Sequence, residues 1–238
     1  MQIIRKDSER AFDEAAAEMI LDQMKSCPDS VIALSTGRTT GNMHRLVSEG
    51  FRNDPFDISG LTFLAIDEVT GIPDTNPWAC RAKLQKEIIG NIGVGCSNFL
   101  TLPTECDDIE ATGRVFAAEL SHRGGIDLLI LGLGENGHLG FNQPGTPFDS
   151  RIRLSTMDSD LERRIKEDCG LDDSAKLGGI TLGIADLMAA RKIVLVVKGS
   201  SKKAILGKVI NGPVTEEVPA SILQTHPDCT VLTDDKAI

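Results

Sequence analysis

Residues 126–138 read Ile126-Asp-Leu-Leu-Ile-Leu-Gly-Leu-Gly-Glu-Asn-Gly-His138. The first eight form a short apolar run without regular polar alternation, which is typical of a strand covered on both faces. Glycines and a histidine follow at once, where such a strand would end. Four more runs share this character: Val31–Leu34, Leu61–Ile66, Ile193–Val197 and Thr230–Leu232. Together with Ile126–Leu133 they predict a mostly parallel sheet.

Longer amphipathic stretches separate the apolar runs. In Ser8–Cys27 the apolar side chains recur at helical spacing on one face, and Ser8 is of a type that caps helix starts. Four further segments are predicted as helices: Arg81–Ile89, Asp107–Leu120, Asp158–Asp168 and Ser201–Ile210. Alternating strands and helices imply right-handed crossovers and an α/β layered fold. Because the chain shows no repeat or linker, residues 1–238 are predicted to form a single domain.

The composition disfavours several classes of function. The formal net charge of the 238 residues is −10, and the chain has no tyrosine and one tryptophan, so no nucleic-acid partner is expected. No apolar run approaches the length of a membrane span and the N-terminus lacks an apolar signal segment, which predicts a cytoplasmic protein with no membrane partner. The six cysteines form no CxxC pair and no zinc-type spacing with histidine, so reduced thiols and no metal are predicted.

Residues that follow the apolar runs are candidates for a ligand site, because parallel sheets bind ligands beyond the carboxyl ends of their strands. After Val31–Leu34 come Thr36, Gly37, Arg38, Thr39 and Thr40. A glycine, hydroxyls and a guanidinium before a helix start suit a phosphate, although a polar turn that binds nothing has the same composition. Lys202, in a glycine–serine–lysine segment after Ile193–Val197, is a weaker indication of an anion site.

Asp67 and Glu68 follow the run Leu61–Ile66. Two adjacent carboxylates at a strand end suit a general base, a metal ligand or a helix cap. Because neighbouring residues of a strand point to opposite faces, only one of the two can readily meet a given substrate atom. Considered alone, the pair fits a capping or solvated role better than a catalytic one.

The loop after Ile126–Leu133 is the most unusual segment of the chain. It places His138 among glycines that include Gly134 and Gly137, with Asn136 and Gln143 on either side. Glycines let the backbone approach a ligand closely and histidine titrates near neutral pH, so the loop indicates an active-site histidine. The alternative is a tight turn around a buried, hydrogen-bonded histidine.

In combination, these segments resemble the hexosamine-6-phosphate deaminase/isomerase family, and the resemblance extends over almost the whole chain. Its specific part is the histidine signature at Gly132–Pro144. The other matching segments gain weight from their order and spacing: Thr36–Thr40, Asp67–Val69, Gly71, Asn76–Cys80, Gly179–Ile184, Gly199–Lys202 and Pro219–His226. The resemblance implies a modified Rossmann-type three-layer fold and no metal or organic cofactor.

The reaction that the resemblance implies converts a hexosamine 6-phosphate, a small-molecule partner, to a ketohexose 6-phosphate and ammonia. Asp67 would be the base that moves a proton from C2 to C1, and His138 the acid/base that opens the sugar ring. Thr36–Thr40 and Lys202 would hold the phosphate, which turns remote binding energy into orientation of the reacting carbons. The remaining candidate residues around the base and the histidine are Glu68, Gly134, Asn136, Gly137 and Gln143.

Three positions depart from the family pattern. Asn136 stands where many members have aspartate, and Gln143 where the pattern has glutamate, so His138 lacks an adjacent carboxylate from the signature. Either Glu68, Glu135 or another acid supplies the missing negative charge near His138, or ring opening is slow, or the substrate differs from that of the family. Glu167 stands in the column of a phosphate-binding arginine, and Arg38 is expected to supply that missing charge.

Two other functions stay open. One is 6-phosphogluconolactonase-type lactone hydrolysis on the same fold, and the other is a sugar-phosphate-binding protein without catalysis. The sequence does not separate a glucosamine from a galactosamine substrate, or a monomer from a homo-oligomer. None of the six cysteines falls in the site as the motifs define it.

Overall fold

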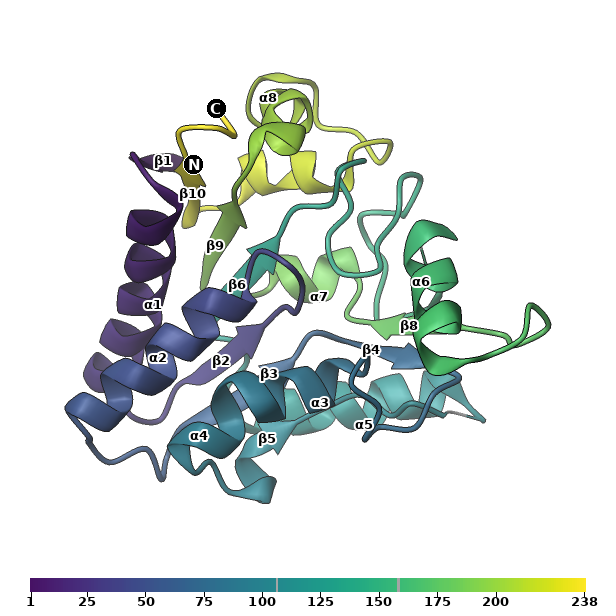
Figure 1. The fold of residues 1–238 in the computed structure, drawn as a ribbon, viewed down its shortest axis with the longest axis horizontal. Coiled ribbons are helices and arrows are strands. Elements are labelled where there is room, and N and C mark those ends of the chain that lie inside the picture. Colours follow the sequence, from purple (N-terminus) through teal and green to yellow (C-terminus); the bar gives the residue numbers. More distant parts are fainter. Residues whose placement is uncertain (106, 158) are drawn as a thin grey trace.

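The computed structural model describes residues 1–105, 107–157 and 159–238. Its centre is a parallel seven-stranded sheet in the order β1-β10-β9-β6-β2-β3-β5 (Figure 1). The strands are β1 (Gln2–Lys6), β2 (Val31–Leu34), β3 (Thr62–Ala65), β5 (Phe99–Leu100), β6 (Leu128–Gly132), β9 (Lys192–Val197) and β10 (Cys229–Asp234). All five predicted apolar runs are strands of this sheet. The edge strands β1 and β5 are additional.

Alternate side chains of the central strands enter two separate cores, as the period of two in a strand requires. In β2, Val31 and Ala33 belong to one core, and Ile32 and Leu34 to the other. The second core is covered by α1 (Glu9–Ser26), α2 (Gly41–Asn53), α3 (Cys80–Leu84) and α4 (Gly90–Ile92). The first is covered by α5 (Ile109–His122), α7 (Ile184–Met188) and α8 (Lys203–Asn211). This arrangement confirms the three-layer α/β fold.

The predicted helices are present with shifted or broken ends. The Ser8 hydroxyl accepts a hydrogen bond from the amide of Ala11 at 3.2 Å and so caps α1 as predicted. The predicted helix Arg81–Ile89 is divided into α3, a π-helical segment at Gln85–Ile89 and α4. The others correspond to α5, α6 (Ser159–Cys169) and a 3-10 turn at Ser200–Lys202 followed by α8; Asp158 lies outside the described residues. Among these helices, none is both long and apolar enough to cross a membrane.

A second, antiparallel sheet is absent from the sequence-based prediction. It consists of β4 (Asp67–Thr70), β7 (Arg153–Ser155) and β8 (Gly178–Thr181) in the order β4-β8-β7. These strands are too short and too polar to form an apolar run. Val69 and Phe141 pack there with Ile165 of α6, and Figure 1 shows β4, β8 and α6 together at one side of the molecule. The small sheet therefore builds a wall beyond the carboxyl end of β3.

The connections leave the neighbouring strands β2 and β6 in opposite directions. The helix α2, which follows β2, lies on one face of the sheet, whereas α7, the last helix on the way from β6 to β9, lies on the other. Ser35 joins the two strand ends, because its hydroxyl accepts from the amide of Gly132 at 3.1 Å and its amide donates to the carbonyl of Ile130 at 3.1 Å. A divergence of this kind opens a crevice at the carboxyl edge, where doubly wound sheets bind ligands.

Candidate functional site

The sheet register brings the predicted site loops to one edge. Leu34 of β2 pairs with Ala65 of β3 and with Ile130 of β6, and Gly132 of β6 pairs with Val196 of β9. The four segments that follow these strands, at residues 35–40, 66–68, 133–145 and 198–202, therefore begin side by side. Segments that are distant in sequence can build one site there.

The predicted phosphate loop connects β2 to α2. Gly37 has φ of 148°, in the region that favours glycine, and its carbonyl accepts hydrogen bonds at 3.3 Å from both the amide and the hydroxyl of Thr40. Thr40 directly precedes the 13-residue helix α2, whose first amides have no partner within the helix. Gly37 and Arg38 are exposed. The loop thus places a helix start and a guanidinium at the carboxyl edge, as an anion site needs.

Lys202 adds a second cation to this region. It ends the 3-10 turn Ser200–Lys202, its side chain is 17% exposed, and its Nζ lies 3.9 Å from a carboxylate oxygen of Glu135. Burial lowers the pKa of Lys202, Glu135 opposes that change, and the positive charge of Arg38 lowers the pKa further. Arg38 is therefore near enough to repel Lys202, and an anion between the two cations would relieve that repulsion.

Asp67 is the first residue of β4 and is 7% exposed. Burial raises the pKa of its carboxyl to about 7; a hydrogen bond with the Cys80 side chain lowers it, and the charge of Glu68 raises it. The positive charge of Lys83 lowers it further. A carboxyl that titrates near neutral pH is suited to take a proton and return it.

Glu68 has a different environment from its neighbour. Its carboxylate accepts hydrogen bonds from three backbone amides: Val69 at 2.8 Å, Cys80 at 2.7 Å and Arg81 at 2.8 Å. Two of these amides belong to the first turn of α3, so Glu68 satisfies the start of that helix. Burial raises the pKa of Glu68, and the three amides act against that change. Of the roles considered for this residue, its contacts support that of a cap.

His138 is oriented by Asn136. The Asn136 Oδ1 atom lies 3.1 Å from the backbone nitrogen of His138, which must donate, and 2.8 Å from the ring Nδ1. Asn136 Nδ2 donates to Oε1 of Gln143 at 3.0 Å. Because an amide oxygen only accepts, the ring Nδ1 carries the proton in the neutral imidazole and Nε2 is the basic nitrogen.

Glycines permit the close contacts of this loop. A Cβ at Gly134 would lie 2.3 Å from Nδ1 of His138, so any side chain there would overlap the imidazole. Gly140 has φ of 57°, and a Cβ there would lie 3.1 Å from Oδ2 of Asp67. The backbone two residues after His138 therefore approaches the carboxyl of Asp67, which brings the two predicted catalytic loops together.

We expect Gly134→Ala to lower kcat for the reaction proposed below by about 10-fold or more, because the methyl group must displace the ring of His138. The matched control is Gly132→Ala, whose Cβ would meet only the Ser35 hydroxyl, at 3.9 Å. Steady-state kinetics and thermal melting of both variants would check this. Equal kcat values for the two alanine variants would show that the ring of His138 needs no such space.

Glu68 and Glu135, the acids considered as replacements for the missing signature carboxylates, have other partners. Glu68 binds the amides of α3, and Glu135 accepts a hydrogen bond from Ser201 at 3.2 Å in addition to its ion pair with Lys202. Asn136, a neutral amide, contacts the ring Nδ1 of His138 at 2.8 Å. Gln143 acts one step further away, through Asn136.

Two residues of this region were not predicted as site residues. Cys80 is buried beside Asp67, although no cysteine lies in the site that the motifs define. Arg153 donates to Oδ1 of Asn142 at 2.5 Å and to the hydroxyl of Thr146 at 2.9 Å, which fixes the end of the histidine loop. Cys80 does end the matching segment Asn76–Cys80, but its place beside Asp67 depends on the turn that precedes α3.

Of the three cations of α6, Arg163 and Lys166 form ion pairs along that helix, and Arg164 donates to the backbone oxygen of Asp160 at 3.2 Å. Arg163 contacts Glu167 at 2.9 Å and Asp160 at 3.7 Å, and Lys166 contacts Glu162 at 2.9 Å. Glu167, in the column of the family's phosphate-binding arginine, thus forms an ion pair within its own helix. The two cations that the structure brings close together at the carboxyl edge are Arg38 and Lys202.

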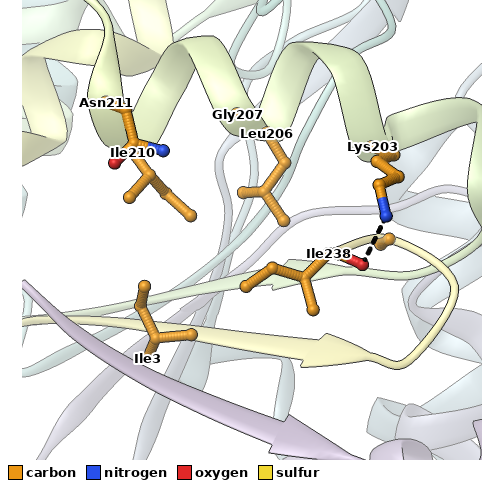
Figure 2. Close-up of a pocket in the computed structure, with 8 residues that line it drawn as sticks. Ile3, Lys203, Leu206, Gly207, Ile210, Asn211 and Ile238 are labelled. Carbon is orange, nitrogen blue, oxygen red and sulfur yellow. Dashed lines mark hydrogen bonds between the residues drawn. The ribbon is translucent and has the colours of Figure 1, made fainter.

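A separate hollow lies away from these loops, between α8 and the chain end. Its walls are mainly apolar, with Ile3, Leu206, Ile210 and Ile238 pointing toward one another, and Lys203 binds the backbone oxygen of Ile238 at 3.0 Å (Figure 2). None of the predicted site residues lines it. Within residues 1–105, 107–157 and 159–238, no group of three or more His, Cys, Asp or Glu side chains is placed to hold a metal ion.

Comparison with known sequences points to one family. The model of the family described as glucosamine-6-phosphate isomerases/6-phosphogluconolactonase matches residues 6–232. A glucosamine-6-phosphate deaminase from Geobacillus sp. (strain WCH70) is 31% identical over 238 residues, covering 100% of this chain and 95% of the relative. A glucosamine-6-phosphate deaminase from Lachnoclostridium phytofermentans is 33% identical over 235 residues, covering 98% of each chain.

Comparison with solved structures gives the same fold. A monomeric glucosamine-6-phosphate deaminase superposes with a TM-score of 0.92 at 28% identity, covering 100% of this chain and 98% of the other. The 6-phosphogluconolactonase from Trypanosoma brucei superposes with a TM-score of 0.79 at 16% identity, covering 99% and 97%. At the lower identity the likeness shows the fold alone.

Proposed function

This chain belongs to the family of glucosamine-6-phosphate isomerases and 6-phosphogluconolactonases, and we propose that it is a glucosamine-6-phosphate deaminase, which releases fructose 6-phosphate and ammonia. The relatives at 31–33% identity over nearly the whole chain are deaminases, whereas the lactonase is 16% identical. The observation that carries the proposal is the buried Asp67 beside the loop of His138.

In the proposed mechanism, His138 opens the sugar ring. Its Nδ1–H is directed to Asn136, so Nε2 takes the proton of the C1 hydroxyl while the ring C1–O5 bond breaks. The same imidazole then gives the proton to O5, which leaves an open-chain aldehyde with the amine at C2. Asn136 holds the ring in the tautomer that this exchange needs.

Asp67 then moves the proton between carbons. Its carboxylate takes the proton from C2, the C–H electron pair forms the C1–C2 double bond, and the aldehyde oxygen takes a proton from solvent to give an enolamine. Asp67 returns its proton to C1 and the amine lone pair forms a C2–N double bond. Water hydrolyses this iminium to the ketone and ammonia, and one proton returns to solvent. Arg38 and Lys202 hold the phosphate at the far end, which keeps C1 and C2 in register with Asp67.

An ammonia-release assay tests the proposal. We expect glucosamine 6-phosphate to yield equimolar ammonia and fructose 6-phosphate; galactosamine 6-phosphate and 6-phosphogluconolactone serve as the competing substrates. Faster turnover of galactosamine 6-phosphate would identify that epimer as the substrate. Hydrolysis of the lactone without ammonia release would identify the protein as a lactonase instead of a deaminase. If calorimetry showed binding of glucosamine 6-phosphate with no product over hours, the protein would be a sugar-phosphate-binding protein instead.

We expect Gln143→Glu to raise kcat by about two- to ten-fold, because a carboxylate would accept the Asn136 amide and its charge would favour the imidazolium that forms during ring opening. The increase should be seen in the rate of ammonia release from glucosamine 6-phosphate, and the KM of the variant should equal that of wild type. Gln143→Met, which removes the Oε1 acceptor without adding charge, is the control and should lower kcat. A Glu variant no faster than wild type would show that ring opening does not limit turnover.

A further inference from the structure

A buried ion pair lies at the carboxyl edge of the large sheet, and the proposed mechanism does not use it. Lys198 directly follows β9, and its Nζ contacts the two carboxylate oxygens of Asp13 in α1 at 2.8 and 3.1 Å. The side chain of Asp13 is 6% exposed and that of Lys198 is 13% exposed. The same ammonium lies 5.4 Å from the centre of the buried Phe12 ring. The attraction between these two charges is therefore screened less than in an exposed pair.

Asp13 also binds the start of α2. Its Oδ2 accepts a hydrogen bond from Nδ2 of Asn42 at 3.3 Å, and Asn42 is the second residue of that helix. The helices α1 and α2 lie side by side (Figure 1). One carboxylate of α1 thus joins the start of α2 to the residue after β9, and this Lys198–Asp13–Asn42 arrangement is termed the Asp13 bridge.

Both ends of the Asp13 bridge adjoin a predicted phosphate residue. Asn42 belongs to the helix start that follows the loop of Arg38. Lys198 precedes the 3-10 turn that ends at Lys202, whose amide donates to the carbonyl of Gly199 at 3.1 Å. The two cations proposed to share the phosphate therefore belong to segments that the same carboxylate connects.

We propose, resting on the proposed function, that Asp13 and Lys198 are positioning residues which hold the two cation-bearing segments of the phosphate site at the spacing that a phosphate needs. Arg38 and Lys202 carry like charges, which repel each other while no anion lies between them. The Asp13 carboxylate binds both segments and so opposes their separation. The site is pre-organised for the anion, because the segments need not be drawn together when it binds.

The test removes the ion pair without leaving an unpartnered charge. Loss of one partner of a buried pair is strongly destabilising, whereas replacement of both by apolar side chains is often neutral. In Asp13→Leu/Lys198→Met, leucine has the branching of aspartate and methionine has nearly the length of lysine, and the net charge of the chain is unchanged. Calorimetry with inorganic phosphate should show a Kd about 3- to 10-fold above that of wild type, because pre-organisation is lost.

The kinetic constants separate this positioning role from a general structural one. A bound phosphate draws the segments to the same spacing with or without the Asp13 bridge. The KM for glucosamine 6-phosphate should therefore rise with the Kd, while kcat stays within about two-fold of wild type. A variant with general damage to the fold would lose kcat as well, and thermal melting would show a lower Tm.

A second ion pair between α1 and α2 provides the matched control. Lys25, in the last turn of α1, contacts Asp54 just after the end of α2 at 2.6 Å. This pair also connects the two helices, but at their ends away from the phosphate loop. Lys25→Met/Asp54→Asn removes one charge of each sign, as the Asp13 double variant does. Its Kd for phosphate and its KM should equal those of wild type.

Asn42→Ala tests the bridge without altering the core. Asn42 is exposed, and the substitution removes only the hydrogen bond from α2 to Asp13. Its Kd for phosphate should lie between those of wild type and the double variant. A wild-type Kd in Asn42→Ala would overturn the proposal even if the double variant does not fold, and so would a wild-type Kd in a folded double variant.

Phosphate binding is measured without turnover, so this proposal and the proposed function can fail separately. If the Kd rises as expected but wild type releases no ammonia, the positioning role stands and the deaminase function fails. If ammonia is released and the Kd is the same in wild type and every variant, the deaminase function stands and Asp13 and Lys198 form only a structural pair.

Discussion

Asp67→Asn should lower kcat for ammonia release by about 10²- to 10⁴-fold, the usual contribution of a general base. The amide cannot take the C2 proton, whereas the cations proposed to hold the phosphate, Arg38 and Lys202, lie in other segments. Binding of glucosamine 6-phosphate, measured by calorimetry, should therefore change little. Turnover within 10-fold of wild type would reject Asp67 as the base.

The same substitution should make the protein more stable at alkaline pH. Burial raises the pKa of Asp67 from 3.8 to about 7, so between these values the folded protein binds more protons at this site than the unfolded chain does. Stability therefore falls as pH rises through this window, and the ionised carboxylate is destabilising above it. Asp67→Asn removes the effect, and its Tm should exceed that of wild type at pH 8 but not at pH 4.

Glu68→Gln is the matched control for Asp67→Asn. Glu68 accepts three backbone amides at the start of α3, and an amide side chain offers one fewer acceptor and no charge. The expected result is a smaller loss of kcat, because the Glu68 carboxylate is occupied by the backbone amides at the start of α3. If Glu68→Gln reduced kcat as severely as Asp67→Asn while Tm stayed constant, Glu68 would take part in the chemistry.

Lys202→Ala and Arg38→Ala should each raise KM by about 10- to 100-fold, since hydrogen bonds to charged groups contribute about 1.5–3 kcal/mol. The increase in KM should be larger for Lys202→Ala than for Arg38→Ala. The Lys202 side chain is the more buried, and burial lowers its pKa in the absence of an anion. Both variants should also weaken competitive inhibition by inorganic phosphate, and kcat should fall less than kcat/KM.

Lys203→Ala is the control for the phosphate cations. It removes a lysine next in sequence to Lys202, but Lys203 contacts the C-terminal Ile238 beside the apolar hollow of Figure 2. Its KM should equal that of wild type. An Arg38→Ala variant with unchanged KM would show that Arg38 does not replace the arginine whose column is occupied by Glu167.

Local sequence signals predicted the central sheet but not the small one. The strands of the large sheet are buried on both faces, so each leaves an apolar run that is visible without knowledge of the fold. The strand β4 begins with Asp67 and Glu68, whose burial depends on β8 and on the turn before α3. A residue pair of this kind looks like a polar loop until its partners are known.

The candidate site shows the same division. The sequence by itself determined the α/β class, the loops that can bind an anion and the presence of a histidine among glycines, because backbone conformation and strand burial depend on residue type and near neighbours. Only the tertiary structure decided that the Glu68 carboxylate caps α3 while Asp67 lies beside the loop of His138, and that Arg38 lies near Lys202. Proximity, desolvation and hydrogen-bond partners arise between segments far apart in the chain, so they exist only once the chain has folded.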